Sequence, residues 1–215
     1  YEFSVLPADI LGQVYERFLG KVIRLTSAHH AVVEDKPEVK KAGGVFYTPT
    51  FIVEYIVKNT LGKLLEDKSP GQVGVGRGTP LRILDMSCGS GSFLIGAYQY
   101  LLDWYLGGYF LEPGKWSKGS TPRLNQVSSP EGPLWKLTTS ERKRILLDHI
   151  YGVDIDSQAV EVTKLSLLLK VLEGESDESI GKQLSMFRQR ALPDLAGNIK
   201  CGNSLIGPDF YSNQP

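Results

Sequence analysis

Three short stretches of the sequence combine acidic or amide side chains with glycine or serine after an apolar run. They are DMSCGSGSF (85–93), GVDIDS (152–157) and CGNS (201–204). In the first stretch, Gly89 and Gly91 let the backbone pass close to a ligand, because glycine has no Cβ and adopts positive φ at little cost. Asp85 precedes this turn, where a carboxylate attracts a cation and repels phosphate. A ligand with an ammonium or sulfonium group therefore fits the turn better than a dinucleotide does.

The glycine turn also departs from the known phosphate-binding patterns. The dinucleotide fingerprint has a third glycine three positions after the second, where this sequence has Leu94, and no P-loop lysine follows the turn. A single Gly-x-Gly pair is common in ordinary turns between a strand and a helix. The pattern therefore disfavours NAD or another nucleotide, but the turn alone assigns no function.

The second and third stretches offer groups that could hold a nucleoside. An acid after the second strand of a parallel α/β fold often accepts both ribose hydroxyls, and Asp154 is the better candidate, because an acid that ends an apolar strand needs a partner. Asp156 or Ser157 can instead cap the following helix. The amide of Asn203 suits the exocyclic amine of adenine, although an asparagine in a turn is the simpler alternative. Taken together, the three stretches predict S-adenosylmethionine as the cofactor.

Apolar periodicity predicts the elements that must position these residues. Residues 7–25 are typical of an amphipathic helix with one buried stripe, residues 26–44 of a loop or short hairpin, and residues 48–67 of a largely buried helix capped by Thr48 or Thr50. Strands are expected within 81–88 and 198–206, and residues 141–155 are expected to form a short helix that runs into a strand. Helices are expected at 92–106 and 157–174, the second ending at Gly174. This alternation predicts a parallel α/β sheet whose ligand crevice lies at the carboxyl ends of the strands. Residues 107–140 lack periodicity and are expected to form a surface insertion.

Composition sets limits on the class of protein. The 215 residues include 24 basic and 24 acidic side chains, and this zero net charge weakly disfavours DNA binding by this chain alone, since a partner domain could supply a basic surface. The two cysteines have no CxxC spacing and favour reduced thiols in the cytoplasm. No apolar run reaches the length of a membrane span, and the first residues lack a signal-peptide pattern. We therefore expect no membrane partner, and nothing predicts a metal site.

The chain also resembles a known family in five places. DMSCGSGSF, YGVDIDSQAVEVTKLSLLL and IKCGNSLIG resemble the first three cofactor motifs of the N6-adenine DNA methyltransferases of restriction–modification systems. GGVFYTPTFIVEYIV (43–57) resembles the motif before their glycine turn, and DILGQVYERFLG resembles a helix common ahead of it. The resemblance implies a Rossmann-like class I methyltransferase core, incomplete, at 46–215 with the surface insertion 107–140, and an amino-terminal helical segment at 1–45.

The resemblance implies a cofactor-binding role for a defined set of residues. Tyr47 to Pro49 would contact the carboxylate and sulfonium side of the methionine, and Asp85 its ammonium group. Asp154 would hold the ribose, with Ile155 on the adenine ring and Asn203 at its amine. The complete set is Tyr47, Thr48, Pro49, Asp85, Ser87, Cys88, Gly89, Ser90, Gly91, Ser92, Phe93, Asp154, Ile155, Asp156, Asn203 and Ser204. This chain departs from the family at Met86 and Ser157, where proline is more frequent, and at Asn203, where many members have aspartate.

One motif of the family is absent from the sequence. These enzymes hold the flipped adenine with Asn or Asp, then Pro-Pro, then Tyr or Phe, and SNQP at 212–215 does not match it. We therefore expect no catalytic residue in this chain. It would be the cofactor-binding part of a larger enzyme that methylates double-stranded DNA, and would be inactive alone. A nuclease and a specificity domain would be fused to that enzyme or separate from it. The alternatives are a protein-glutamine or RNA methyltransferase of the same class, or a non-catalytic methyltransferase-like structural domain.

Overall fold

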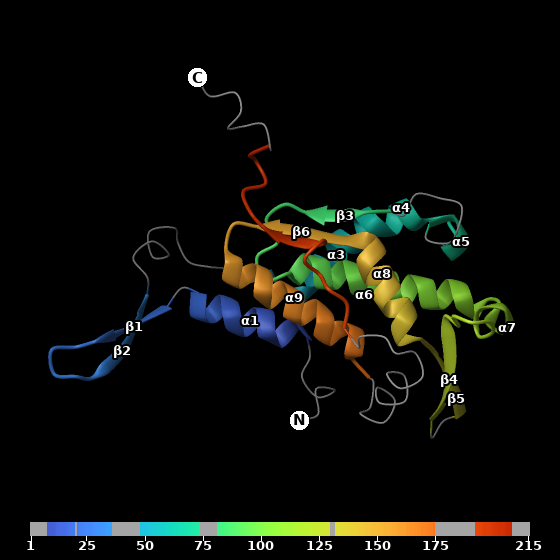
Figure 1. Ribbon diagram of the computed structural model, residues 1–215, viewed down its shortest axis with the longest axis horizontal. Coiled ribbons are helices and arrows are strands. Elements are labelled where there is room, and N and C mark those ends of the chain that lie inside the picture. Colours follow the sequence, from blue (N-terminus) through green and yellow to red (C-terminus); the bar gives the residue numbers. More distant parts are fainter. Residues whose placement is uncertain are drawn as a thin grey trace.

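A three-stranded parallel sheet forms the centre of the protein (Figure 1). The computed structural model describes residues 8–19, 21–35, 48–73, 81–129, 132–174 and 192–207. The sheet has the order β3 (Ile83–Asp85), β6 (Ile150–Asp154) and β7 (Ile199–Cys201). These strands lie where the apolar runs predict them, and their parallel pairing confirms the expected parallel α/β sheet.

Two helices cover one face of this sheet. Helices α6 (Ser92–Phe110) and α9 (Ser157–Leu172) follow β3 and β6, and Figure 1 shows both on the same side of the strands. Ile150 and Ile199 point into this helical layer and are 0% and 1% exposed, whereas Leu84, which alternates to the other face, is 58% exposed. Gly174, at φ +77°, lies just after the C-cap of α9, so the predicted end of this helix is confirmed.

Helix α6 is the central element of the core. It carries three tyrosines, at positions 98, 105 and 109, that are 0% exposed. Their hydroxyls all bond to helix α8 (Thr139–His149), at the Arg142 carbonyl, the His149 ring and the Glu141 carboxylate. These hydrogen bonds avoid the free-energy cost of burying a tyrosine hydroxyl without a partner. Among the described residues, no helix is long and apolar enough to cross a membrane.

The region 107–140 is more ordered than the sequence indicates. Residues 107–110 complete α6, helix α7 (Pro113–Trp116) follows, and β4 (Leu124–Ser129) pairs with β5 (Gly132–Leu137) as an antiparallel hairpin. Leu124 and Leu137 are buried in the same core cluster as Tyr109. The prediction of a surface insertion is therefore wrong for these positions, because apolar side chains of the hairpin pack on the end of α6.

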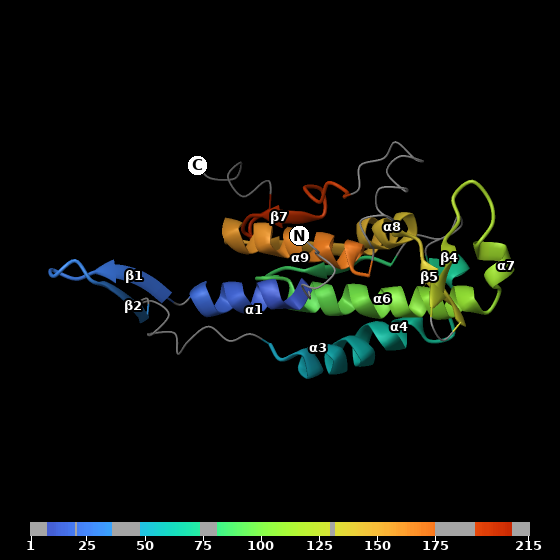
Figure 2. The same ribbon diagram turned by 90° about the horizontal axis from the view of Figure 1, so that it is seen from below.

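The first helix is shorter than predicted and packs by a different face. Helix α1 (Ala8–Leu19) ends before β1 (Lys21–Leu25), which pairs with β2 (Ala31–Asp35), so the expected hairpin is present but begins earlier. Figure 2 shows α1 alongside the helical layer and the hairpin projecting beyond it. The expected buried stripe is wrong, because Ile10, Val14 and Phe18 are 41%, 44% and 69% exposed. The buried Gly12 lies on the face that packs against α9 and α6.

The second predicted helix is present but only half covered. It begins as α3 (Thr50–Val57) and continues through the π-helical η2 (Lys58–Gly62) and α4 (Lys63–Leu65), before the short α5 (Pro70–Val73). Its N-cap is Pro49, without a side-chain cap from either threonine. Val53, Val57, Leu61 and Leu65 are buried, but Phe51 and Tyr55 are 69% and 70% exposed. The expectation of a largely buried helix is wrong, because the described residues that cover it lie on the α6 side.

Candidate functional site

Asp154 connects the loops that follow the three strands. Its Oδ2 accepts a hydrogen bond from the Gly89 N–H at 2.8 Å, and its carbonyl oxygen accepts one from the Gly202 N–H at 2.9 Å. The glycine turn after β3, the acidic loop after β6 and the loop after β7 therefore meet at one edge of the sheet. This is the edge where open α/β sheets bind ligands.

The glycine turn has a conformation that other residues adopt at a cost. Gly89 and Gly91 have φ of +51° and +88°, in the left-handed region. A Cβ on Gly91 would lie 2.8 Å from the Cγ2 atom of Thr163 in α9. The Thr163 hydroxyl donates to the Gly89 carbonyl at 2.8 Å, so α9 holds the turn from behind. Both the dihedral angle and the close approach require glycine at position 91.

Two acidic side chains give the turn a negative potential. Asp85 accepts from the Ser87 N–H at 3.1 Å and Asp154 from the Asp156 N–H at 2.9 Å, and neither forms an ion pair with another described residue. Burial, followed by the negative charges of Asp154 and Asp85, raises the pKa of the Cys88 thiol to about 12. Both carboxylates therefore act electrostatically on the Cys88 thiol of this turn, and negative charges at a site attract a cation.

The other predicted residues of the two later loops have local roles as well. Asp156 is the N-cap of α9 and accepts a hydrogen bond from the Gln158 N–H at 2.9 Å, which is the capping role that its position also predicts. Ile155 is 75% exposed and provides an apolar surface beside the acids. Asn203 is exposed and its Oδ1 accepts from the Leu205 N–H at 3.0 Å, which is a turn contact. Ser204 beside it is also exposed.

The residues ahead of α3 are only partly placed. Tyr47 lies outside the described residues, whereas Thr48 is half-buried and Pro49 is exposed at the start of α3. Thr50 and Ser92, the first residues of α3 and α6, line one cavity. Ser90 is buried, and Phe93 packs against the core. The structure therefore brings this segment beside the glycine turn.

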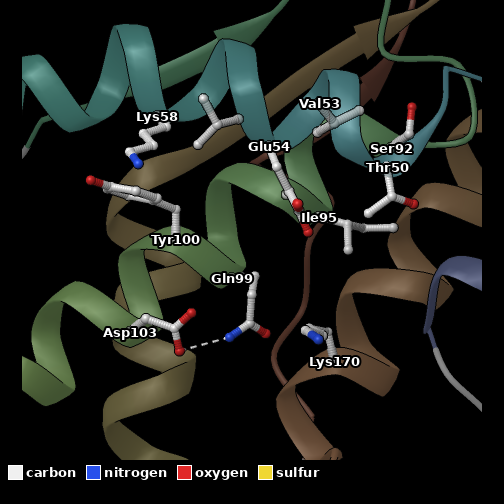
Figure 3. Close-up of a pocket in the computed structure, with 12 residues that line it drawn as sticks. Thr50, Val53, Glu54, Lys58, Ser92, Ile95, Gln99, Tyr100, Asp103 and Lys170 are labelled. Atoms are coloured by element: carbon white, nitrogen blue, oxygen red, sulfur yellow. Dashed lines mark hydrogen bonds between the residues drawn. The ribbon is translucent and has the colours of Figure 1, made fainter.

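Figure 3 shows the residues that line this cavity. It measures about 410 Å³ and lies between α3 and α6, with Val53 and Ile95 on its apolar wall and Asp103 and Lys170 at its far side. Asp103 is eleven residues along α6 from Ser92, about 16 Å at the helical rise of about 1.5 Å per residue. Of the described residues at the strand ends, the acids and Asn203 do not line it.

The structure adds residues that sequence reasoning did not place at the site. Tyr15 and Glu16 of α1 reach the loops after β6 and β3, since the Tyr15 hydroxyl donates to Asp156 Oδ2 at 2.9 Å and the Ser90 hydroxyl donates to Glu16 Oε1. Burial, followed by the Asp156 hydrogen bond and charge, raises the pKa of Tyr15 above its usual value. Gly12, Tyr15 and Glu16 are three and four residues apart, so they share one helical face. This spacing is the feature of the sequence from which their common contact surface could have been predicted.

Comparison with known proteins identifies the family. The model of the MmeI DNA-methyltransferase domain matches residues 76–208. The type II restriction enzyme and methyltransferase RM.Eco57I of Escherichia coli is 36% identical over 206 residues, which are 96% of this chain and 18% of that protein. The chain belongs to the methyltransferase family of restriction–modification systems. The resemblance seen in the sequence motifs is thereby confirmed.

Two further relatives are also named as methyltransferases. The putative type II restriction enzyme and methyltransferase RM.MjaORFECS2P of Methanocaldococcus jannaschii is 29% identical over 94% of this chain and 17% of its own length. The adenine-specific methyltransferase PglX of Streptomyces coelicolor is 26% identical over 62% of the chain and 8% of its own length. The chain thus spans less than a fifth of the length of the curated relatives that it matches.

Proposed function

We propose that this chain binds S-adenosylmethionine at the carboxyl ends of β3, β6 and β7, as the cofactor-binding part of a DNA adenine-N6 methyltransferase. The observation that carries the proposal is the pair of hydrogen bonds from Gly89 and Gly202 to Asp154, which joins the three loops. The negative potential of Asp85 and Asp154 supports a ligand that carries both an ammonium and a sulfonium group. The proposed fold is the Rossmann-like class I methyltransferase sheet.

Each part of the proposed site has a role that its chemistry allows. Each oxygen of Asp154 accepts one backbone N–H, and a carboxylate oxygen has a second lone pair for a ribose hydroxyl. Asp85 would pair with the ammonium group, and the left-handed glycines let the turn approach the ligand closely. Ile155 would pack on the adenine, with Asn203 at its amine. When bound, the cofactor supplies an electrophilic methyl group.

The family supports DNA as the methyl acceptor. Two relatives are named as restriction enzymes and methyltransferases, and the third as adenine-specific. We extend these properties to this chain as a proposal, together with a nuclease and a specificity domain, fused or separate, and a cytoplasmic setting. The sequence lacks the Asn/Asp-Pro-Pro-Tyr/Phe motif, so the proposal assigns no catalytic residue here and expects no methyl transfer by the 215 residues alone.

A methyl-transfer assay with competing acceptors tests this function. The chain and the longer polypeptide encoded by its parent gene would each be incubated with methyl-labelled S-adenosylmethionine and with double-stranded DNA, RNA and protein. We expect label in DNA with the longer polypeptide, recovered as N6-methyldeoxyadenosine after digestion, and none with the chain. Label in RNA or in protein glutamine would support the alternative acceptors, and label in cytosine would contradict the adenine assignment.

A further inference from the structure

We infer that helix α1 is a working part of the cofactor site, in which Glu16 and Tyr15 are positioning residues that fix the two loops contacting the cofactor. The inference rests on the proposed function for the identity of the ligand, but the hydrogen bonds that carry it do not. They join a helix near the start of the chain to loops that lie 74 and 141 residues further on.

The first contact holds the glycine turn. The hydroxyl of Ser90, which is 1% exposed, donates to Glu16 Oε1, and a Cβ on Gly89 would lie 3.9 Å from the same oxygen. A Cβ on Gly12 would lie 3.2 Å from the Ser90 hydroxyl oxygen, so the α1 backbone lies directly against this side chain. Glu16 and Gly12 are one helical turn apart and face the turn together.

The second contact holds the acidic loop. The Tyr15 hydroxyl donates to Asp156 Oδ2 at 2.9 Å, while Asp156 Oδ1 caps α9. The Asp156 N–H also donates to Asp154 Oδ1 at 2.9 Å. Asp156 therefore links Tyr15 to Asp154, the residue proposed to bind the ribose. Consecutive residues of α1 thus contact the turn after β3 and the loop after β6.

The chemistry of these contacts favours positioning over stability. Glu16 Oε2 is buried and has no hydrogen-bond partner among the described residues, and such an oxygen carries a desolvation cost. The exposed face of α1, with Val14 and Phe18, contributes little burial. A helix held for stability alone would be expected to bury its apolar stripe here rather than a carboxylate. Fixing the loops before the ligand arrives raises affinity, because less ordering is needed on binding.

Four variants of the 215-residue chain test the inference by two readouts. Glu16→Ala removes the acceptor for Ser90, Glu16→Gln keeps an amide oxygen in its place, Tyr15→Phe removes only the hydroxyl, and Phe18→Ala is the control on the exposed face of α1. The first readout is the Kd for S-adenosylmethionine by calorimetry. The second, without cofactor, is amide hydrogen exchange at Gly89 and Gly91, whose N–H groups bond to Asp154 Oδ2 and the Cys88 carbonyl.

The expected results separate positioning from a general loss of structure. Glu16→Ala and Tyr15→Phe should each weaken cofactor binding about tenfold, the effect of losing one hydrogen bond to a charged group. Exchange at Gly89 and Gly91 should accelerate in Glu16→Ala while exchange at Ile95 stays unchanged. Glu16→Gln and Phe18→Ala should bind within about twofold of the unmodified chain, and all four should melt within a few degrees of it.

Two outcomes would overturn the inference, and a third concerns the function alone. Unchanged exchange at the turn in Glu16→Ala would show that α1 does not hold it, and unchanged affinity in both Glu16→Ala and Tyr15→Phe would show that the contacts do not serve binding. Absence of S-adenosylmethionine binding by the unmodified chain would contradict the proposed function. In that case the exchange measurement still decides whether α1 positions the loops.

Discussion

Replacing Gly91 with alanine tests the geometry of the glycine turn most sharply. The alanine would have to adopt φ near +88°, and a left-handed conformation costs a residue with a Cβ about 1–2 kcal/mol. Its Cβ would also lie 2.8 Å from Thr163 Cγ2 and 2.9 Å from Thr163 Oγ1, and such overpacking costs about 1–3 kcal/mol. The two costs together lower the free energy of unfolding by about 2–5 kcal/mol.

The assay is urea denaturation followed by circular dichroism, with two companion variants. Gly107→Ala is the matched control, because Gly107 is an exposed position in α6 with open space around its Cβ, and alanine there should stabilise the helix by about 0.5–1 kcal/mol. Adding Thr163→Ser to Gly91→Ala removes the Cγ2 atom and should recover about 1 kcal/mol through non-additivity. A free energy of unfolding for Gly91→Ala within about 0.5 kcal/mol of the unmodified chain would show that position 91 does not require glycine.

Three further predictions concern the core and the thiols. Glu141→Gln leaves Arg144 and Arg123 without their buried carboxylate and should lower the free energy of unfolding by about 2–3 kcal/mol. Glu112→Gln, in the exposed pair with Lys115, should change it by less than about 0.5 kcal/mol. Equal losses for the two variants in urea denaturation would contradict this. Burial lowers the pKa of His149 in the folded chain, whereas the unfolded histidine keeps its usual pKa of about 6.5. The unfolded chain therefore takes up a proton first as the pH falls, and the free energy of unfolding should fall between pH 7 and pH 5. A rise over this interval in denaturation curves would count against a buried neutral ring. The exposed Cys201 should react rapidly with a thiol reagent at pH 8 and the buried Cys88 only after denaturation, and two fast thiols in the native chain would disagree with the raised pKa of Cys88.

The strands and their functional ends could be predicted because their signals are local. Short apolar runs followed by Asp85, Asp154 or Asn203 are typical of strands that stop at a polar loop, and parallel pairing then brings these ends to one edge. The glycine turn was predictable for the same reason, since Gly89 and Gly91 serve a backbone conformation that few other residues adopt.

The packing partners of the outer helices could not be predicted in this way. Periodicity in α1 indicates an apolar face, but Ile10 and Phe18 are exposed because the helix packs by its Gly12 face, where its backbone can approach Ser90. In α3 the apolar residues go round most of the helix, and only contacts in the folded chain decide that Val53 is buried and Phe51 is not. Glu16 was missed because its partner, Ser90, is distant in the sequence.

The most direct test of the central claim is calorimetric titration of the chain with S-adenosylmethionine, with NAD as the control ligand and Asp154→Ala as the control variant. We predict binding of S-adenosylmethionine and not of NAD, and loss of this binding in Asp154→Ala, because that carboxylate joins the loops and is proposed to hold the ribose. Unchanged binding by Asp154→Ala, or binding of NAD in place of S-adenosylmethionine, would contradict this prediction.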